Sequence, residues 1–261
     1  MDCKNESPAI REMKRAYPDK FLPVDQILAH IQAGDRIFIG TGCGEPQYLV
    51  QALTGYVESH PEAFSDAEAL HVWTLGIDPY TSEKFGSNFR RNSFFIGSNI
   101  RQAVNAGLDN YIPVFLSQVP DLLRRHTVPI DVALIQTCPP DAHGFMSLGI
   151  SVDIVKAAVE MASLVIAQVN SHMPRVHGDS FVHITDMDFI LPYDEPLLEY
   201  ETALPDETVR GMGKYVSNVV EDGDTIQVGY GSIPSAVISC LATKHDLGVH
   251  SELLTDDIVS L

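Results

Sequence analysis

Apolar and polar positions along the chain follow two alternating patterns. Short runs of apolar residues are typical of strands buried on both faces, whereas apolar residues three or four positions apart are typical of helices that pack one side against a core. The runs predict strands at residues 36–40, 70–75, 93–97, 114–117, 131–137 and 164–169. Because helical stretches separate them, the sequence predicts an α/β fold with an open, mostly parallel sheet and flanking helices.

The helical pattern is clearest at residues 24–34, 46–53, 100–104 and 152–162. Gly34 is expected to end the first of these helices, and Ser98 is expected to cap the third. Residues 172–192 break the alternation, because they mix β-branched residues with Gly, Pro and Asp. We expect this segment to form an extended hairpin or an excursion from the sheet.

Two segments of the chain share one motif. GDRIFIGTGCGEPQYLVQAL at residues 34–53 and GDTIQVGYGSIPSAVISCL at residues 223–241 both read G-D-x-I-x-[IV]-G-x-G, followed by a proline and a helical pattern. The G-D pairs are 189 residues apart and the prolines are 188 apart, so one inserted residue in the first copy reconciles them. The agreement indicates an internal duplication.

The duplication suggests how the chain is organised. We expect an N-terminal extension at residues 1–20, a first α/β domain at 21–205, and the truncated beginning of a second, homologous domain at 206–261. A complete second copy would need roughly another 130 to 150 residues, so we expect the chain to be a fragment. In the alternative, the residues after 205 complete the sheet of a single domain.

Composition and charge mainly exclude classes of function. The 261 residues are 45% hydrophobic, which allows a large core. A formal charge of −18 opposes binding to nucleic acids and anionic membranes, and an anionic cofactor would need a locally positive pocket. No apolar run approaches eighteen residues, and the polar N-terminus does not resemble a secretory signal. We expect a cytoplasmic protein with no nucleic-acid or membrane partner.

Several common catalytic and metal-binding patterns are not found. The four cysteines lie far apart without C-x-x-C spacing, and His172, His177 and His183 match no ligand spacing, so we expect neither a metal nor disulfides. Ser180 and Ser232 are not flanked by a G-x-S-x-G elbow. Neither glycine turn matches the full dinucleotide fingerprint, and the chain has no P-loop.

Each copy of the repeat places a glycine-rich turn, GTGCGEP or GYGSIP, between a strand and a helix. Exposed backbone N–H groups and the helix dipole at such a turn favour an anion, such as a phosphate or an oxyanion. Glycine is also the ordinary residue of a tight strand-to-helix turn. A purely structural role therefore stays open for both turns.

A carboxylate follows the second turn in LGVHSELLTDD, where the pattern from Leu247 predicts a strand that ends near Glu252. When Val249 is matched with Val72 of the first copy, Leu75 falls opposite Glu252, so the acid is particular to the second copy. In open α/β sheets ligands bind beyond the carboxyl ends of the strands, where Glu252 and the second turn should both lie. A carboxylate beside an oxyanion-stabilising turn suits acyl transfer, because it can attack a thioester.

Simpler interpretations of these residues also stay open. Glu252 could be a solvated acid at the end of a strand. His250 would share a strand face with Glu252, where it could orient the carboxylate or simply pack.

GYGSIPSAV and KHDLGVHSELLTDDIV resemble the junction and catalytic segment of the acetyl-CoA hydrolase/4-hydroxybutyrate CoA-transferases, a group within the family I CoA-transferases. GSNIRQAVNAG, YIPVFLSQVP and MPRVHGDSFVHITDMDF are similar as well, so the resemblance extends from about residue 21 to residue 261. It implies that Glu252 attacks an acyl-CoA to form an anhydride and then a glutamyl-CoA thioester, and passes CoA to a short-chain carboxylate. It also implies that backbone amides of the second turn contact CoA or the thioester oxygen, at Gly229, Tyr230, Gly231, Ser232 and Ile233.

The resemblance further implies a CoA-transferase-like fold, with CoA as the co-substrate and with an acyl-CoA and a short-chain carboxylate as partners. We expect the intact protein to be a homo-oligomer. Members of the family have a second half with further CoA contacts that is absent here, so residues 1–261 alone are expected to turn over slowly or not at all. The alternatives are an acyl-CoA (acetyl-CoA) hydrolase that uses the same glutamate and a non-catalytic module that binds CoA or a partner subunit.

Overall fold

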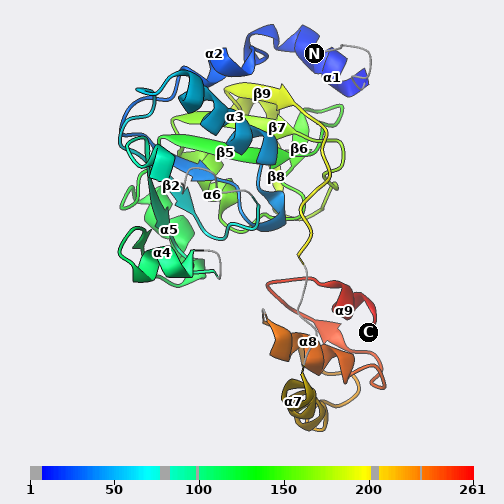
Figure 1. Cartoon of the computed structure of the whole chain (residues 1–261). Helices are drawn as coiled ribbons and strands as arrows, with labels where there is room; N and C mark the ends of the chain where they lie inside the picture. The colour runs from blue at the N-terminus through cyan, green and yellow to red at the C-terminus, as the bar shows by residue number, and fades with distance from the viewer. Residues whose placement is uncertain (1–7, 77–82, 98–99, 201–205, 230) are drawn as a thin grey trace. The chain divides into compact units, whose positions relative to one another are not determined.

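The computed structural model describes residues 8–76, 83–97, 100–200, 206–229 and 231–261 (Figure 1). Ser98 and Tyr230, both singled out in the sequence, lie outside these ranges. The chain divides into two compact units, Met1–Glu199 and Tyr200–Leu261.

One parallel sheet of seven strands forms the centre of the first unit. Its order is β4-β3-β2-β1-β5-β7-β9, and every neighbouring pair is parallel. The strands are β1 (Arg36–Ile39), β2 (Ala67–His71), β3 (Phe89–Ser93), β4 (Asn110–Tyr111), β5 (Val132–Thr137), β7 (Leu164–Val169) and β9 (Phe189–Pro192). The predicted open, mostly parallel α/β sheet is confirmed. The strand order reverses between β1 and β5, which is the position where open α/β sheets commonly bind ligands.

Helices cover both faces of this sheet (Figure 1). They are α1 (Pro8–Ala16), α2 (Val24–Leu28), α3 (Gln47–Ser59), α4 (Arg101–Asn105), α5 (Val119–Arg124) and α6 (Val155–Met161). Ile37 and Ile39 of β1 belong to the core with α2 and α3, and Phe38 belongs to the core with α1, α5 and α6. Since successive side chains of a strand point to opposite faces, a strand covered on both sides is apolar throughout. This explains why β1, β5 and β7 are mostly apolar, with polar residues only near their ends.

The segment at residues 172–192 only partly follows its prediction. Its strand β8 (Phe181–His183) leaves the main sheet and pairs antiparallel with β6 (Phe145–Ser147). The chain then returns as β9, which pairs parallel with β7 at the edge of the main sheet. The segment is therefore an excursion followed by a seventh strand that the sequence pattern did not reveal.

Three predicted strands are wrong in position or type. The strand expected at 70–75 is β2, which begins earlier and ends at His71, and the one expected at 93–97 is β3, which ends where the prediction begins. Residues 114–117 form no strand in the described chain, and a 3-10 helix (Leu116–Gln118) lies there instead. The apolar residues after β2 and β3 misled the prediction because Val72 and Phe94 are buried although they lie beyond the ends of these strands. Within β3, charged side chains hide the strand pattern, although Arg91 is buried in an ion pair with Asp109.

The predicted helix ends are also corrected. The helix expected at 24–34 stops at Leu28 and is capped by the Ala29 backbone. Gly34 is not its cap: with φ of +79°, Gly34 forms the turn that leads into β1. The third predicted helix begins at Arg101, and the side chain of Ile100, the residue before it, makes no capping hydrogen bond. The cap predicted at Ser98 lies outside the described residues.

The second unit contains two short parallel strands and three helices in its described residues. They are α7 (Glu207–Ser217), β10 (Thr225–Ile226), α8 (Ser232–Ser239), β11 (Gly248–Val249) and α9 (Asp256–Val259). Asp206 caps α7 by accepting a hydrogen bond from the Val209 amide at 2.8 Å. Gly213 allows α7 to approach α8 closely, because a Cβ there would lie 2.6 Å from the Ala236 carbonyl oxygen.

The two copies of the repeat have the same local geometry. Gly34 and Gly223 have φ of +79° and +83°, and the aspartate that follows each accepts a hydrogen bond at 2.8 Å from an amide three residues earlier. Further along, Asp66 and Asp246 both adopt positive φ, at +62° and +56°, just before β2 and β11. Three independent features thus coincide, so the sequence repeat is also a structural one.

The strand register corrects one detail of the sequence alignment. Ile37 of β1 pairs with Ala69, and Ile226 of β10 pairs with Val249. Val249 therefore corresponds to Ala69 and not to Val72, and Val72 instead of Leu75 falls opposite Glu252. The residue opposite the glutamate is apolar in either alignment. That the second unit begins a complete domain like the first, with boundaries at 20/21 and 205/206, stays a prediction.

Candidate site at the second glycine turn

The first glycine turn is closed by the protein itself. The amide of Gly42 donates to the Trp73 carbonyl at 2.8 Å, and the amide of Gly44 donates to the Thr41 carbonyl at 3.1 Å and to Ser151 Oγ at 3.3 Å. Ser151 also fills the space above the turn, since a Cβ on Gly44 would lie 2.8 Å from the Ser151 Cβ. The Ser151 hydroxyl thus occupies the place where a ligand oxygen would accept a hydrogen bond from the Gly44 amide.

Buried polar side chains connect the first turn to the neighbouring strands. Gln136 of β5 donates from Nε2 to the Glu45 carbonyl at 3.1 Å, and Asn170 donates to Gln136 Oε1 at 2.7 Å. Thr41 donates its hydroxyl to Asp153. Burial raises the pKa of Asp153, although the Thr41 hydrogen bond acts in the opposite direction. Hydrogen-bonded side chains of the protein therefore fill the crevice between β1 and β5. The anion site that the sequence suggested at the first turn is not open.

The second turn is open. Gly231 has φ of +127° and precedes α8, and a Cβ on Gly229 or Gly231 would meet only Pro234, at 3.9 Å. The amides of Gly231, Ser232 and Ile233 donate to no acceptor among the residues that the structure describes. Because the N-terminus of a helix carries partial positive charge, three unsatisfied donors there form a suitable cradle for a negatively charged oxygen.

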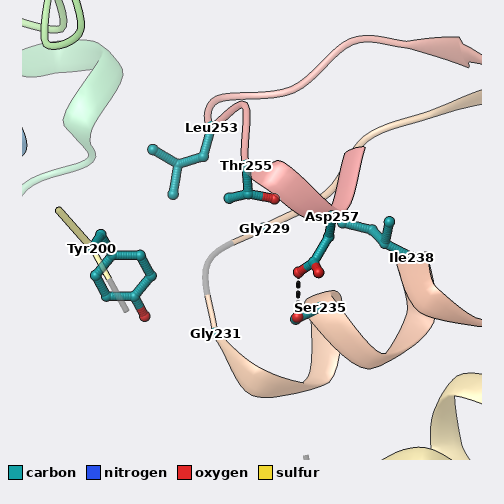
Figure 2. Close-up of a pocket in the computed structure, with 8 residues that line it drawn as sticks. All are labelled: Tyr200, Gly229, Gly231, Ser235, Ile238, Leu253, Thr255 and Asp257. Carbon is teal, nitrogen blue, oxygen red and sulfur yellow. Dashed lines mark hydrogen bonds between the residues drawn. The ribbon is translucent and has the colours of Figure 1, made fainter. Parts of the chain in front are cut away.

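The segment after β11 lies beside this turn and leaves a small cleft of about 20 Å³, room for about one water molecule. Figure 2 shows Ser235 of α8 directed at Asp257, to which it donates a hydrogen bond. The cleft residues are Tyr200, Gly229, Gly231, Ser235, Ile238, Leu253, Thr255 and Asp257 (Figure 2). A ligand larger than a water molecule would therefore have to lie over the open side of the turn, outside this cleft.

Glu252 lies on the segment that follows β11, and its side chain is exposed. It forms no hydrogen bond or ion pair with any part of the chain that the structure describes. His250 is also exposed and follows the last residue of β11, so the expectation that the two side chains share a strand face is wrong. β10 and β11 are parallel, which brings the segments after them, with the second turn and Glu252, to the same edge.

The structure also identifies residues that the sequence did not. Ser151 and Gln136 close the first turn from about 100 positions away, so no local pattern could indicate them. In the sequence, Ser235 and Asp257 are ordinary polar residues, and nothing in their spacing indicates that α8 and α9 bring them together. Of the predicted turn residues, the structure describes Gly229, Gly231, Ser232 and Ile233, and Tyr230 lies outside the described residues.

These features define the class of protein. It is an α/β protein in which a strand, a glycine turn and a helix occur twice, and the second copy of the turn is open to a ligand. The family model described as "Acetyl-CoA hydrolase/transferase N-terminal domain" matches residues 5–199. The chain belongs to this family.

Relatives with known names agree with this assignment. The chain is 38% identical over 250 residues to the 4-hydroxybutyrate coenzyme A transferase of Clostridium kluyveri, an alignment that covers 96% of this chain and 57% of the relative. It is 35% identical to the succinyl-CoA:acetate/propanoyl-CoA:succinate CoA transferase of Fasciola hepatica, with coverage of 99% and 59%. The chain thus spans less than two thirds of the length of the relatives that it matches.

Solved structures give the same fold. RipA from Yersinia pestis superposes with a TM-score of 0.85 at 26% identity, over 95% of this chain and 60% of that one. The 4-hydroxybutyrate CoA-transferase from Porphyromonas gingivalis superposes with a TM-score of 0.77 at 27% identity, over 94% of this chain and 57% of that one. The fold is therefore that of the CoA-transferases.

Two further features of the described residues bear on the site. They contain no cluster of three or more His, Cys, Asp or Glu side chains that could hold a metal ion. In the same part of the chain, no helix has the length and apolar character that crossing a bilayer requires.

Proposed function

We propose that this chain carries the nucleophile and the oxyanion-binding turn of a CoA-transferase that moves CoA from an acyl-CoA to a short-chain carboxylate. One observation carries the proposal: in the described part of the second turn, in the copy that contains Glu252, the amides of Gly231, Ser232 and Ile233 have no acceptor, whereas Gly42 and Gly44 of the first turn donate within the chain. The names of the relatives, all CoA transferases, support the same reaction class.

In the proposed reaction, a carboxylate oxygen of Glu252 attacks the thioester carbonyl carbon, and the C–S bond breaks to release the CoA thiolate. The product is an acyl-glutamyl anhydride. The thiolate then attacks the Glu252 carbonyl, which releases the original acyl group as its carboxylate and leaves glutamyl-CoA. An acceptor carboxylate reverses the two steps, so that a new acyl-CoA forms and Glu252 is regenerated. No external acid, base or oxidant is consumed.

The amides of Gly231, Ser232 and Ile233 would donate to the oxygen on which negative charge develops in each addition step. Donors held in position by a helix terminus need no reorganisation when that charge appears, which makes them effective in stabilising the transition state. Glycine at the turn matters because a side chain would project into the space that the thioester needs. Gly229 would allow similarly close approach of the CoA chain.

Transfer also requires that water is excluded from the glutamyl-CoA intermediate. Glu252 is exposed in this chain, so we infer that residues 1–261 alone turn over slowly or not at all, and that the additional length present in the relatives supplies the rest of the pocket. If water reached the intermediate in the complete protein, the same glutamate would give a hydrolase.

The test is acetate-dependent isotope exchange with acetyl-CoA. It would be measured for the 261-residue chain and for the chain with any native sequence that continues it, each as the wild type, as Glu252→Gln and as Glu221→Gln. Glu221 is an exposed glutamate of the same unit and serves as the matched control. In the chain that carries its native continuation, we expect exchange at least roughly a thousandfold lower in Glu252→Gln and unchanged in Glu221→Gln, because a neutral amide cannot act as the nucleophile.

The alternatives give different results in the same assay. A hydrolase releases CoA at a rate that does not depend on acetate. A non-catalytic module binds CoA equally well with glutamate or glutamine at position 252 and shows no exchange in any form.

A further inference from the structure

The segment that carries Glu252 contacts the residues that flank the second turn at three points. The first lies next to the glutamate: Ser251 Oγ donates to the Val228 carbonyl at 2.6 Å. Val228 lies immediately before Gly229, where the turn begins. The residue before the proposed nucleophile is therefore bonded to the residue before the proposed oxyanion turn.

The second point lies five residues beyond Glu252. Ser235 Oγ of α8 donates to the Asp257 carboxylate, as the dashed line in Figure 2 shows. Ser235 also donates its amide to the Gly231 carbonyl at 3.3 Å, which closes the first turn of α8. One serine thus contacts the glycine turn through its backbone and the Glu252 segment through its side chain.

The third point is apolar. Ile258 of α9 packs with Val228 and Ile238 in the small core of the second unit, and the three side chains are about 2 to 8% exposed. This contact holds the far end of the segment but does not set its register, because apolar packing has no direction. The two serine hydrogen bonds supply that direction.

We propose that Ser251, Ser235 and Asp257 form a clamp that holds Glu252 at the open amides, which makes them positioning residues for the transfer reaction. This inference rests on the function proposed above. The exposed Glu252 side chain has no partner among the described residues, so its place depends on its neighbours in the chain. On either side of it, Ser251 bonds to Val228 before the turn and Asp257 accepts from Ser235 after it. Misplacing a reacting group by about 1 Å lowers rates by about a hundredfold, so loss of either hydrogen bond should reduce kcat by about ten- to a hundredfold.

The clamp is tested by its effect on amide exchange of the segment and on kcat. Ser251→Ala and Ser235→Ala each remove one hydrogen bond. Ser251→Thr keeps a hydroxyl donor, and Asp257→Asn keeps an acceptor oxygen. Ser239→Ala is the matched control, because Ser239 lies on the same helix but bonds only to the Ala236 carbonyl within it. In amide hydrogen–deuterium exchange, both alanine variants should speed exchange of residues 250–258, and the control should not.

In the acetyl-CoA exchange assay, the alanine variants should lower kcat while KM for acetyl-CoA stays within about twofold, and Ser251→Thr should restore most of the rate. A merely structural role would lower the fraction of active protein without rescue by threonine. Unchanged amide exchange in both alanine variants, or an unchanged kcat, overturns the clamp. If the wild type is inactive in every form, the proposed function fails, and amide exchange alone then decides whether the clamp exists.

Discussion

Protonation of one buried histidine should contribute to destabilising the first unit in acid. His71 ends β2 and is only 1% exposed. Burial lowers the pKa of His71 from its usual 6.5 to about 3, and the charge of Arg91 acts in the same direction. The imidazole is therefore neutral in the folded chain at every pH at which the protein would normally be studied.

The sign and size of the effect follow from this shift. Below pH 6.5 the unfolded chain binds a proton at His71 and the folded chain does not, so acid favours unfolding. The contribution of His71 is fully present above pH 6.5 and is lost progressively as the pH falls towards 3. Since each unit below the unfolded pKa corresponds to about 1.4 kcal/mol, the loss is about 2 kcal/mol at pH 5.

Urea unfolding at pH 7.5 and at pH 5 measures this loss. The only tryptophan, Trp73, lies two residues from His71, so its fluorescence reports on the first unit. The difference in unfolding free energy between the two pH values should be about 2 kcal/mol smaller in His71→Gln than in the wild type. His126→Asn, which removes an exposed histidine from the same unit, should leave the difference unchanged. Equal pH dependence in wild type and His71→Gln would refute the argument.

Two glycine substitutions test the contrast between the turns. Gly44→Ala should destabilise the first unit by about 1 to 3 kcal/mol, because its Cβ would lie 2.8 Å from that of Ser151, and Ser151→Gly in the same chain should recover most of the loss in urea unfolding. Failure of the double variant to recover would mean that Ser151 does not fill the turn. Gly231→Ala should cost about 1 to 3 kcal/mol through backbone strain at φ of +127° and should weaken CoA binding in calorimetry. Gly211→Ala, in an open position on α7, should be neutral or slightly stabilising, and equal effects at Gly211 and Gly231 would contradict the assigned turn.

Buried apolar strands were the most predictable part of the fold. The bounds of β7 match the prediction, and β5 differs by one residue, because a strand covered on both faces is mostly apolar. β3 was misplaced because the charge of Arg91 is neutralised by Asp109, 18 positions away, and such pairing cannot be inferred from neighbours in sequence. Prediction thus succeeded where burial alone determines the residue type and failed where a distant partner does.

The candidate site shows the same limit. The motif located both turns and the acidic residue that distinguishes the second copy. The motif could not reveal that the first turn is closed, because the closing residue, Ser151, comes from a different loop 107 positions after Gly44. The role of Glu252 stays a prediction, since its exposed side chain has no partner in the described chain that would show its chemistry.

The difference between the two turns has a thermodynamic consequence. Ser151 gives the first turn a permanent acceptor, so the folded first unit gains nothing there from any solute. The second turn depends on water or on a ligand to satisfy its donors, and anything that binds it binds the folded state alone. By mass action, such a ligand stabilises the second unit selectively. The local stability of that unit would then rise and fall with the supply of substrate, whereas the first unit would serve as a constant support.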